Sequence, residues 1–189
     1  MIFIDGGVDA VREQRFRTRP TPVSRCWSLL LCLGLIGCDA LPRDNAGALE
    51  RASGGELRVG VVENPPWVRF DNQTITGLEP ELIEAWAKSI NARVFWQRGA
   101  ESNLVEALDR RELDVVAAGF DTKTPYHSKL ALSQPYVEVE DRRGAKKKHL
   151  LAVTPGESAL LLSLDRFLAA QDRASLKERA EAQQQDASP

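Results

Sequence analysis

The chain has 189 residues, of which 43% are hydrophobic and 28% are charged, enough for one globular domain of modest size but not for two large ones. Its formal net charge of −2 gives no indication of a nucleic-acid-binding surface, so no nucleic-acid partner is expected. The chain has only two histidines, and all three cysteines lie between Cys26 and Cys38. Neither a metal site nor a cofactor is therefore expected.

The first 38 residues have the pattern of an export signal. Five arginines precede a short apolar run over residues 27–36, which is too short for a spanning helix of about 20 residues. The phrase Leu35-Ile36-Gly37-Cys38 resembles a bacterial lipobox, in which the signal is cut before the cysteine. Residues 1–37 are therefore expected to be a lipoprotein signal peptide, with Cys38 carrying diacylglycerol and often a third acyl chain such as palmitate. A plain signal peptide, or a short buried helix with a chance cysteine, is the alternative.

The residues after the expected cleavage site predict a location and a tether. Asp39 resembles the signal that keeps some lipoproteins in the inner membrane of Gram-negative bacteria. This predicts a protein anchored by lipid at the periplasmic face of the inner membrane, with the outer membrane as the alternative. Residues 38–55 are polar and without periodicity, which predicts a lipidated tether.

Strands and helices are predicted to alternate over residues 57–119. The β-branched run 57–62 predicts a buried strand, and Pro65 and Pro66 end it because proline cannot donate to a ladder. Apolar side chains at spacings of three and four predict a helix over residues 77–90. A strand over 93–96, a helix over 103–112 and a strand over 113–119 complete the pattern. Such alternation favours a parallel sheet with right-handed crossovers.

The second half of the chain is less regular. A charged turn near residues 138–147 precedes an apolar run over 150–153 and a helix over 158–170. The polar segment 172–189 is predicted to be either an exposed helix or frayed.

Six short phrases occur in a characteristic order along the chain. They are Pro65-Pro66-Trp67, residues 77–82, Leu113–Val116, Ala118-Gly119, Thr124-Pro125 and Ser133-Gln134-Pro135-Tyr136. In this order they resemble the first lobe of the bacterial extracellular solute-binding proteins of the polar amino-acid type, family 3. The resemblance implies an α/β fold: a single three-layer lobe of the periplasmic binding protein type II fold over residues 56–171. Its central, mostly parallel sheet would be flanked by helices.

A family member has a second lobe inserted after the Pro-Tyr pair, and the chain then returns as a strand. The phrase Lys148–Val153 resembles that returning strand, but only eleven residues separate it from Tyr136. The second lobe is therefore expected to be missing and replaced by a turn near residues 138–147. One lobe can bury only one face of a ligand, so weak binding by the monomer is expected.

The resemblance implies a ligand site at the carboxyl ends of the strands, where open α/β sheets bind ligands. In the family an aromatic residue at the position of Trp67 packs on the ligand, although Trp67 could instead be an exposed loop residue or pack on Phe70. The loop after the third strand offers backbone N–H groups and a threonine hydroxyl to a carboxylate. The candidate ligand-binding residues are Glu63, Trp67, Gly119, Asp121, Thr122, Thr124, Tyr126 and His127.

The loop after Gly119 departs from the family pattern. No arginine follows Pro125, and Asp121 stands where threonine is usual. Because an aspartate repels a carboxylate, a cationic or amine ligand fits as well as an α-amino acid, with Asp121 and Glu63 as ammonium partners. His127 or Lys129 could replace the arginine only as a weaker donor, and both His127 and Tyr126 could be ordinary surface residues.

Two functions remain open from the sequence. The first is a lipid-anchored solute-binding protein that binds a small polar solute, an amino acid or amine, for an inner-membrane permease such as that of an ABC transporter. The second is a degenerate single-lobe interaction or regulatory module for a membrane partner, without tight ligand binding. A homodimer that rebuilds a cleft is compatible with either.

No enzymatic activity and no catalytic residues are expected. The sequence has no Ser-His-Asp set, paired-carboxylate motif or phosphate loop. Some transglycosylases carry a lobe of this kind, but their catalytic domain would need space that this chain lacks.

Overall fold

The computed structural model describes residues 45–141 and 143–186 of the chain. The expected signal peptide, Cys38 and Asp39 lie outside the described residues. No helix within the described part is long and apolar enough to cross a membrane.

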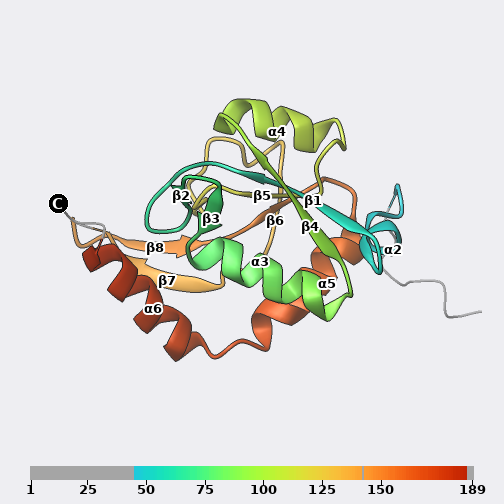
Figure 1. Cartoon of the computed structure of the whole chain (residues 1–189). Coiled ribbons are helices and arrows are strands. Elements are labelled where there is room, and N and C mark those ends of the chain that lie inside the picture. Colours follow the sequence, from blue (N-terminus) through green and yellow to red (C-terminus); the bar gives the residue numbers. More distant parts are fainter. Residues whose placement is uncertain (1–44, 142, 187–189) are drawn as a thin grey trace, which may run out of the picture. The chain divides into compact units, whose positions relative to one another are not determined.

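A five-stranded sheet in the order β4-β1-β5-β9-β6 forms the centre of the lobe (Figure 1). Its strands are β1 (Glu56–Val61), β4 (Arg93–Arg98), β5 (Val115–Ala117), β6 (Ala131–Leu132) and β9 (Ala152–Val153). β1 pairs in parallel with both β4 and β5, whereas β9 pairs antiparallel with β5 and with β6. The sheet is thus parallel where the sequence alternates strand and helix, and antiparallel where the chain returns.

Helices cover both faces of this sheet (Figure 1). α3 (Leu78–Ser89) and α5 (Ser158–Ala169) share one hydrophobic cluster with the sheet, and α4 (Glu101–Asp109) belongs to a second cluster. Trp86 of α3 is fully buried, and its Nε1 donates to Ser163 Oγ of α5 at 3.2 Å. The helix expected over residues 77–90 is confirmed, and its buried stripe forms the core on that face.

The residues of β1 face the two sides of the sheet in turn, and the small residue on the α4 side allows that helix to pack closely. Leu57, Val59 and Val61 face the cluster of α3 and α5. A Cβ on Gly60 would lie 2.8 Å from Leu113 Cδ1, so glycine is needed on the α4 side. The resulting three-layer arrangement is the α/β fold class expected from the sequence.

Two antiparallel hairpins complete the strands. β2 (Arg69–Asp71) pairs with β3 (Thr74–Thr76), and β7 (Val137–Glu140) pairs with β8 (Lys146–His149). The returning segment expected as one strand over residues 148–153 is therefore wrong in detail, because it is divided into β8 and β9.

Two hydrogen bonds donated by backbone N–H groups explain why the returning segment is divided into β8 and β9. Leu150 N donates to Phe120 O at 3.0 Å, and Leu151 N donates to Ser133 Oγ at 2.9 Å. Both N–H groups are thus taken by loops rather than by a neighbouring strand.

The tether expected over residues 38–55 is wrong for its last part. Ala48–Ala52 form helix α2, in which Ala48 and Ala52 are buried. The buried Glu157 carboxylate accepts the N–H groups of Ala46 and Ala48 at 2.9 and 3.1 Å. The segment gives no periodic signal because small alanines and two distant carboxylates, Glu157 and Asp114, rather than an apolar stripe, hold it on the lobe.

The polar segment after residue 172 contains helix α6 (Arg173–Asp186). Leu176 and Ala180 are its buried side chains and belong to the same cluster as α3 and α5. α6 packs against β7 and runs beside the β7–β8 hairpin (Figure 1).

A candidate ligand-binding site

A cavity of about 500 Å³ lies beyond the carboxyl ends of β1 and β5. The loop after β1 contributes Asn64 to Trp67, and Gly119 follows β5. The β7–β8 hairpin and α6 supply the remaining lining residues. The cavity therefore lies at the sheet edge where ligands of open α/β sheets bind, as the sequence predicted.

Trp67 packs on aromatic neighbours at the inner end of this cavity. Its ring centroid lies 3.7 Å from that of His149, with an angle of 31° between the planes. Its ring meets Tyr136 in an edge arrangement at 6.4 Å. Trp67 is only 5% exposed, so it is neither an exposed loop residue nor free to stack its whole face on a ligand.

Gly119 occupies a position that only glycine tolerates. Its φ angle is 65°, and a Cβ there would lie 2.5 Å from Asn64 Nδ2 and 2.6 Å from Trp67 Cδ1. Its N–H donates to Glu79 Oε2 at 2.9 Å. This N–H is therefore already satisfied within the protein, contrary to the expectation that the loop offers it to a ligand carboxylate.

Glu79, in the first turn of α3, is completely buried. Its Oε1 accepts the hydroxyl of Tyr136 at 2.7 Å while its Oε2 accepts Gly119 N–H. Burial raises the pKa of Glu79 to about 7, although both hydrogen bonds favour the carboxylate. Burial, followed by the charge of Glu79, raises the pKa of Tyr136.

Glu79, Gly119 and Tyr136 thus form a buried junction between three segments that are far apart in the sequence. The sequence alone does not identify this role, because the two partners of Glu79 lie 40 and 57 positions further along the chain. The available signal was that Glu79 and Tyr136 both belong to phrases of the family resemblance.

His149 was also missed as a site residue. It is 4% exposed, and among the described residues its Nδ1 has no hydrogen-bond partner. Burial lowers the pKa of His149 to about 4, so the ring is neutral at pH 7. A neutral, buried imidazole therefore supports Trp67 from within the lobe.

The open side of the cavity is rich in carboxylates. Glu140, Asp141 and Glu181 line it, and among the described residues Lys147 alone adds an ammonium group. Lys147 Nζ lies 3.3 Å from Asp121 Oδ2, so that ammonium is already paired. Two backbone N–H groups donate to Asp141 and hold the pKa of that carboxyl below its usual range. We call Glu140, Asp141 and Glu181 the acidic wall.

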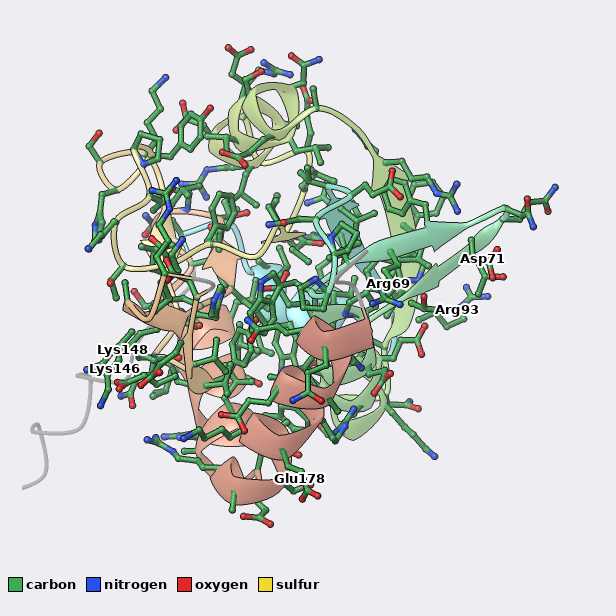
Figure 2. The ribbon with its side chains drawn as sticks, turned by 90° about the vertical axis from the view of Figure 1, so that its left-hand side faces the viewer. Arg69, Asp71, Arg93, Lys146, Lys148 and Glu178 are labelled. Atoms are coloured by element: carbon green, nitrogen blue, oxygen red, sulfur yellow. The ribbon has the colours of Figure 1, made fainter. Side chains whose placement is uncertain are left out.

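The alternation along β8 separates Lys147 from its neighbours. Lys146 and Lys148 project outward from the hairpin (Figure 2) and lie 3.8 and 3.7 Å from the carboxylate oxygens of Glu138. Of the three, Lys147 alone lines the cavity beside Trp67. These three neighbouring lysines therefore do not make this cavity positive.

The structure brings together only part of the predicted site. Trp67 and Gly119 line the cavity, and Asp121 is connected to it through Lys147. Glu63, at the end of β1, is exposed and is not among the lining residues.

The remaining predicted residues lie farther along the loop. Thr124 is buried, and its Oγ1 accepts Tyr126 N–H at 3.4 Å. Tyr126 packs on the hydrophobic cluster of α4. Thr122 and His127 are exposed, and none of these four lines the cavity. No cluster of three or more metal-ligating side chains is found in the described part of the chain.

The sequence model of the bacterial extracellular solute-binding proteins, family 3, matches residues 57–182. The membrane-bound lytic murein transglycosylase F of Vibrio cholerae serotype O1 is 33% identical over 101 residues. That match covers 52% of this chain but only 19% of the relative, so the chain spans about a fifth of the length of the curated relatives it matches.

Solved structures of binding proteins share the fold. The arginine-bound form of domain 1 from TmArgBP has a TM-score of 0.57 at 22% identity, covering 65% of this chain and 98% of that one. An ancestral cationic amino acid solute binding protein has a TM-score of 0.60 at 15% identity, covering 72% and 98%. A periplasmic binding protein of Salmonella typhimurium with high arginine specificity has a TM-score of 0.56 at 14% identity, covering 66% and 98%. These likenesses show the fold, and the family match over residues 57–182 shows that the chain belongs to the bacterial extracellular solute-binding proteins, family 3.

Proposed function

We propose that this protein binds a small, positively charged amino acid or amine in the cavity beside Trp67 and has no catalytic activity. The observation that supports this most directly is the acidic wall. Three carboxylates line the cavity, and Lys147, the one cationic side chain that lines it in the described part of the chain, is paired with Asp121.

The electrostatics of the cavity favour a cation. A cation and a carboxylate 4 Å apart attract by about 1 kcal/mol in bulk water and about 4 kcal/mol near a protein surface. A ligand carboxylate would meet repulsion from the acidic wall and would find Gly119 N–H already bonded to Glu79. Trp67 and the prolines before it add apolar surface for the ligand's carbon chain.

A single lobe is a sufficient scaffold for such binding in a protein of the same fold. Domain 1 from TmArgBP has been solved by itself in an arginine-bound form. We expect modest affinity here, because one lobe encloses less of a ligand than two lobes do.

The proposal places this binding at the periplasmic face of the inner membrane. Lipid on Cys38 would hold the lobe there, and two or more acyl chains are needed for stable anchoring. An inner-membrane permease, such as that of an ABC transporter, would receive the solute.

Isothermal titration calorimetry of the chain with L-arginine, L-lysine, putrescine and L-glutamate tests the proposal. We expect heat from the three cations, with affinities in the micromolar to millimolar range, and none from L-glutamate. Equal binding of L-glutamate, or no binding of any cation, would show the proposal to be wrong.

The second candidate is a single-lobe regulatory module for a membrane partner. The similarity to about a fifth of a lytic murein transglycosylase favours it, because a lobe of this kind there belongs to a longer protein. A chain that binds none of the four solutes but crosslinks to a specific inner-membrane protein would support this candidate instead.

A further inference from the structure

We propose that α6 forms the second wall of the ligand site, where a two-lobed relative has another lobe, and that Glu181 contacts the positive group of the ligand. This inference rests on the proposed function and assigns a role to a segment that the sequence resemblance left without one.

α6 presents one face to the cavity. Trp67 and His149 of the lobe line the cavity together with Glu181, Gln184 and Gln185 of α6. Residues spaced by three and four lie on the same side of a helix, so these three polar side chains form one continuous surface. The cavity therefore lies between two parts of the same lobe.

A different set of residues attaches α6 to the lobe. Leu176 and Ala180, spaced by four, are buried in the cluster formed by the central sheet, α3 and α5. Arg69 donates to Gln183 O at 3.2 Å, and Arg179 pairs with Glu81 of α3. The helix thus docks on the lobe through residues between 176 and 183, and Glu181, Gln184 and Gln185 supply the wall.

This attachment is slight for a helix of 14 residues. The ion pair of Arg179 and Glu81 joins side chains that are 42% and 50% exposed, and exposed pairs contribute little to stability. In the described part of α6, the buried side chains are Leu176 and Ala180. A ligand held between α6 and the lobe would add contacts that stabilise the docked helix.

Glu181 is the charged group that α6 adds to the cavity. Its Oε1 lies 3.7 Å from Lys177 Nζ, one turn earlier, and both side chains are about half exposed. Such a pair is weak in water, so a ligand cation enclosed between Glu181, Glu140 and Asp141 can replace Lys177. The inferred ligand class is therefore a compact cation such as a guanidinium or primary ammonium group.

Calorimetry with L-arginine as the probe tests the role of Glu181. We expect Glu181→Gln to weaken binding by about fivefold, because it removes one carboxylate facing the cation. Glu178→Gln is the matched control: Glu178 is on the same helix and exposed, it projects outward (Figure 2), and it does not line the cavity. This control should change the affinity less than twofold, by about the scatter of surface substitutions.

Hydrogen exchange of the α6 amides tests the wall independently. L-arginine should slow exchange over residues 173–185 in the unmodified chain and in the Glu178→Gln variant. Leu176→Asp should abolish this protection and weaken binding, with thermal unfolding used to confirm that the lobe remains folded.

The outcomes distinguish the two proposals. If the unmodified chain binds L-arginine and Glu181→Gln binds it equally well, with no slowing of α6 exchange, the wall inference is overturned and the proposed function stands. If the unmodified chain binds none of the cations, the proposed function fails, and the inference fails with it.

Discussion

The buried junction meets the cavity at Gly119, whereas the acidic wall lines it with three carboxylates, and the two are built in contrasting ways. The junction places one carboxylate in the interior, with the Tyr136 hydroxyl on one oxygen and Gly119 N–H on the other. The wall places three carboxylates around open space, where water or a ligand can reach them. A buried polar group must be satisfied within the protein, whereas an exposed one is available to a ligand. We therefore expect the junction to control folding and the wall to control binding.

The largest effect should come from Gly119→Ala, which breaks the junction sterically. The added Cβ meets Asn64 and Trp67 and forces a non-glycine residue into a left-handed conformation, and together these should cost about 3 to 4 kcal/mol of unfolding free energy. Urea denaturation measures it. Gly144→Ala is the control, since Gly144 has a similar φ of 76° but no atom within 4 Å of the new Cβ. It should cost only about 1 kcal/mol, and equal losses would contradict the steric explanation.

The pKa values of two buried groups, Glu79 and His149, are shifted in opposite directions, so their contributions to stability depend on pH in opposite ways. The raised pKa of Glu79, from 4.5 to about 7, contributes stability below pH 4.5 that is lost as the pH rises through about 7. The lowered pKa of His149, from 6.5 to about 4, contributes stability above pH 6.5 that is lost as the pH falls through about 4. The two contributions oppose each other between about pH 4.5 and 6.5.

Glu79→Gln should remove the contribution of Glu79 to the pH dependence of the unfolding free energy. Relative to the unmodified chain, its unfolding free energy should rise with pH between about 4.5 and 7, by up to about 3 kcal/mol. Urea denaturation at a series of pH values measures this difference. The exposed Glu84→Gln, on the same helix, should follow the profile of the unmodified chain. A Glu79→Gln profile parallel to that of the unmodified chain would mean that Glu79 does not titrate in this range.

Tyr136→Phe sharpens the comparison by removing a single hydrogen bond from the junction. Glu79 Oε1 would lose its donor while remaining buried, which should cost about 2 kcal/mol. Thermal or urea unfolding measures it. Tyr126→Phe, at a half-buried tyrosine packed on the α4 cluster, should cost less than about 1 kcal/mol. If Tyr136→Phe lost less unfolding free energy than Tyr126→Phe, the hydrogen bond from Tyr136 to Glu79 would not stabilise the junction.

The smallest effect on stability should come from Glu140→Gln in the acidic wall. We expect a change within about 0.5 kcal/mol in unfolding free energy, together with a roughly threefold loss of L-arginine affinity. Asp71→Asn, on the β2–β3 hairpin and away from the α6 wall in Figure 2, should leave both unchanged. Raising the salt concentration should reduce the difference between the two variants, because exposed charges are screened. A large loss of unfolding free energy in Glu140→Gln would contradict the expectation that the acidic wall affects binding rather than folding.

The sheet and its covering helices could be predicted because local patterns determine them. The apolar stripe that buries Leu82, Ile83 and Trp86 is visible in the sequence at helical spacing. The position of the cavity followed from the same alternation, since it lies where β1 and β5 end.

The side chains that shape the cavity could not be predicted in the same way. Glu79 acquires its role only when α3, the loop after β5 and the segment before β7 meet, and no spacing encodes that meeting. His149 lies in a strand that is polar in sequence, and in the described part of α6 only Leu176 and Ala180 are buried apolar residues that indicate docking. The shape of the cavity depends on contacts between segments far apart in the sequence, and the hydrophobic periodicity of a single segment does not predict such contacts.

The contacts that hold α2 have a mechanical consequence. Glu157 accepts N–H groups of Ala46 and Ala48, and Arg51 and Arg58 both bind the buried Asp114 at the start of the sheet. α2 precedes β1, whereas the cavity lies beyond the other end of that strand. A force applied to the chain from its amino-terminal side would be borne by these carboxylates and the strand beneath them. The cavity would be shielded from that load, so tension on the chain before α2 would leave the geometry around Trp67 undistorted.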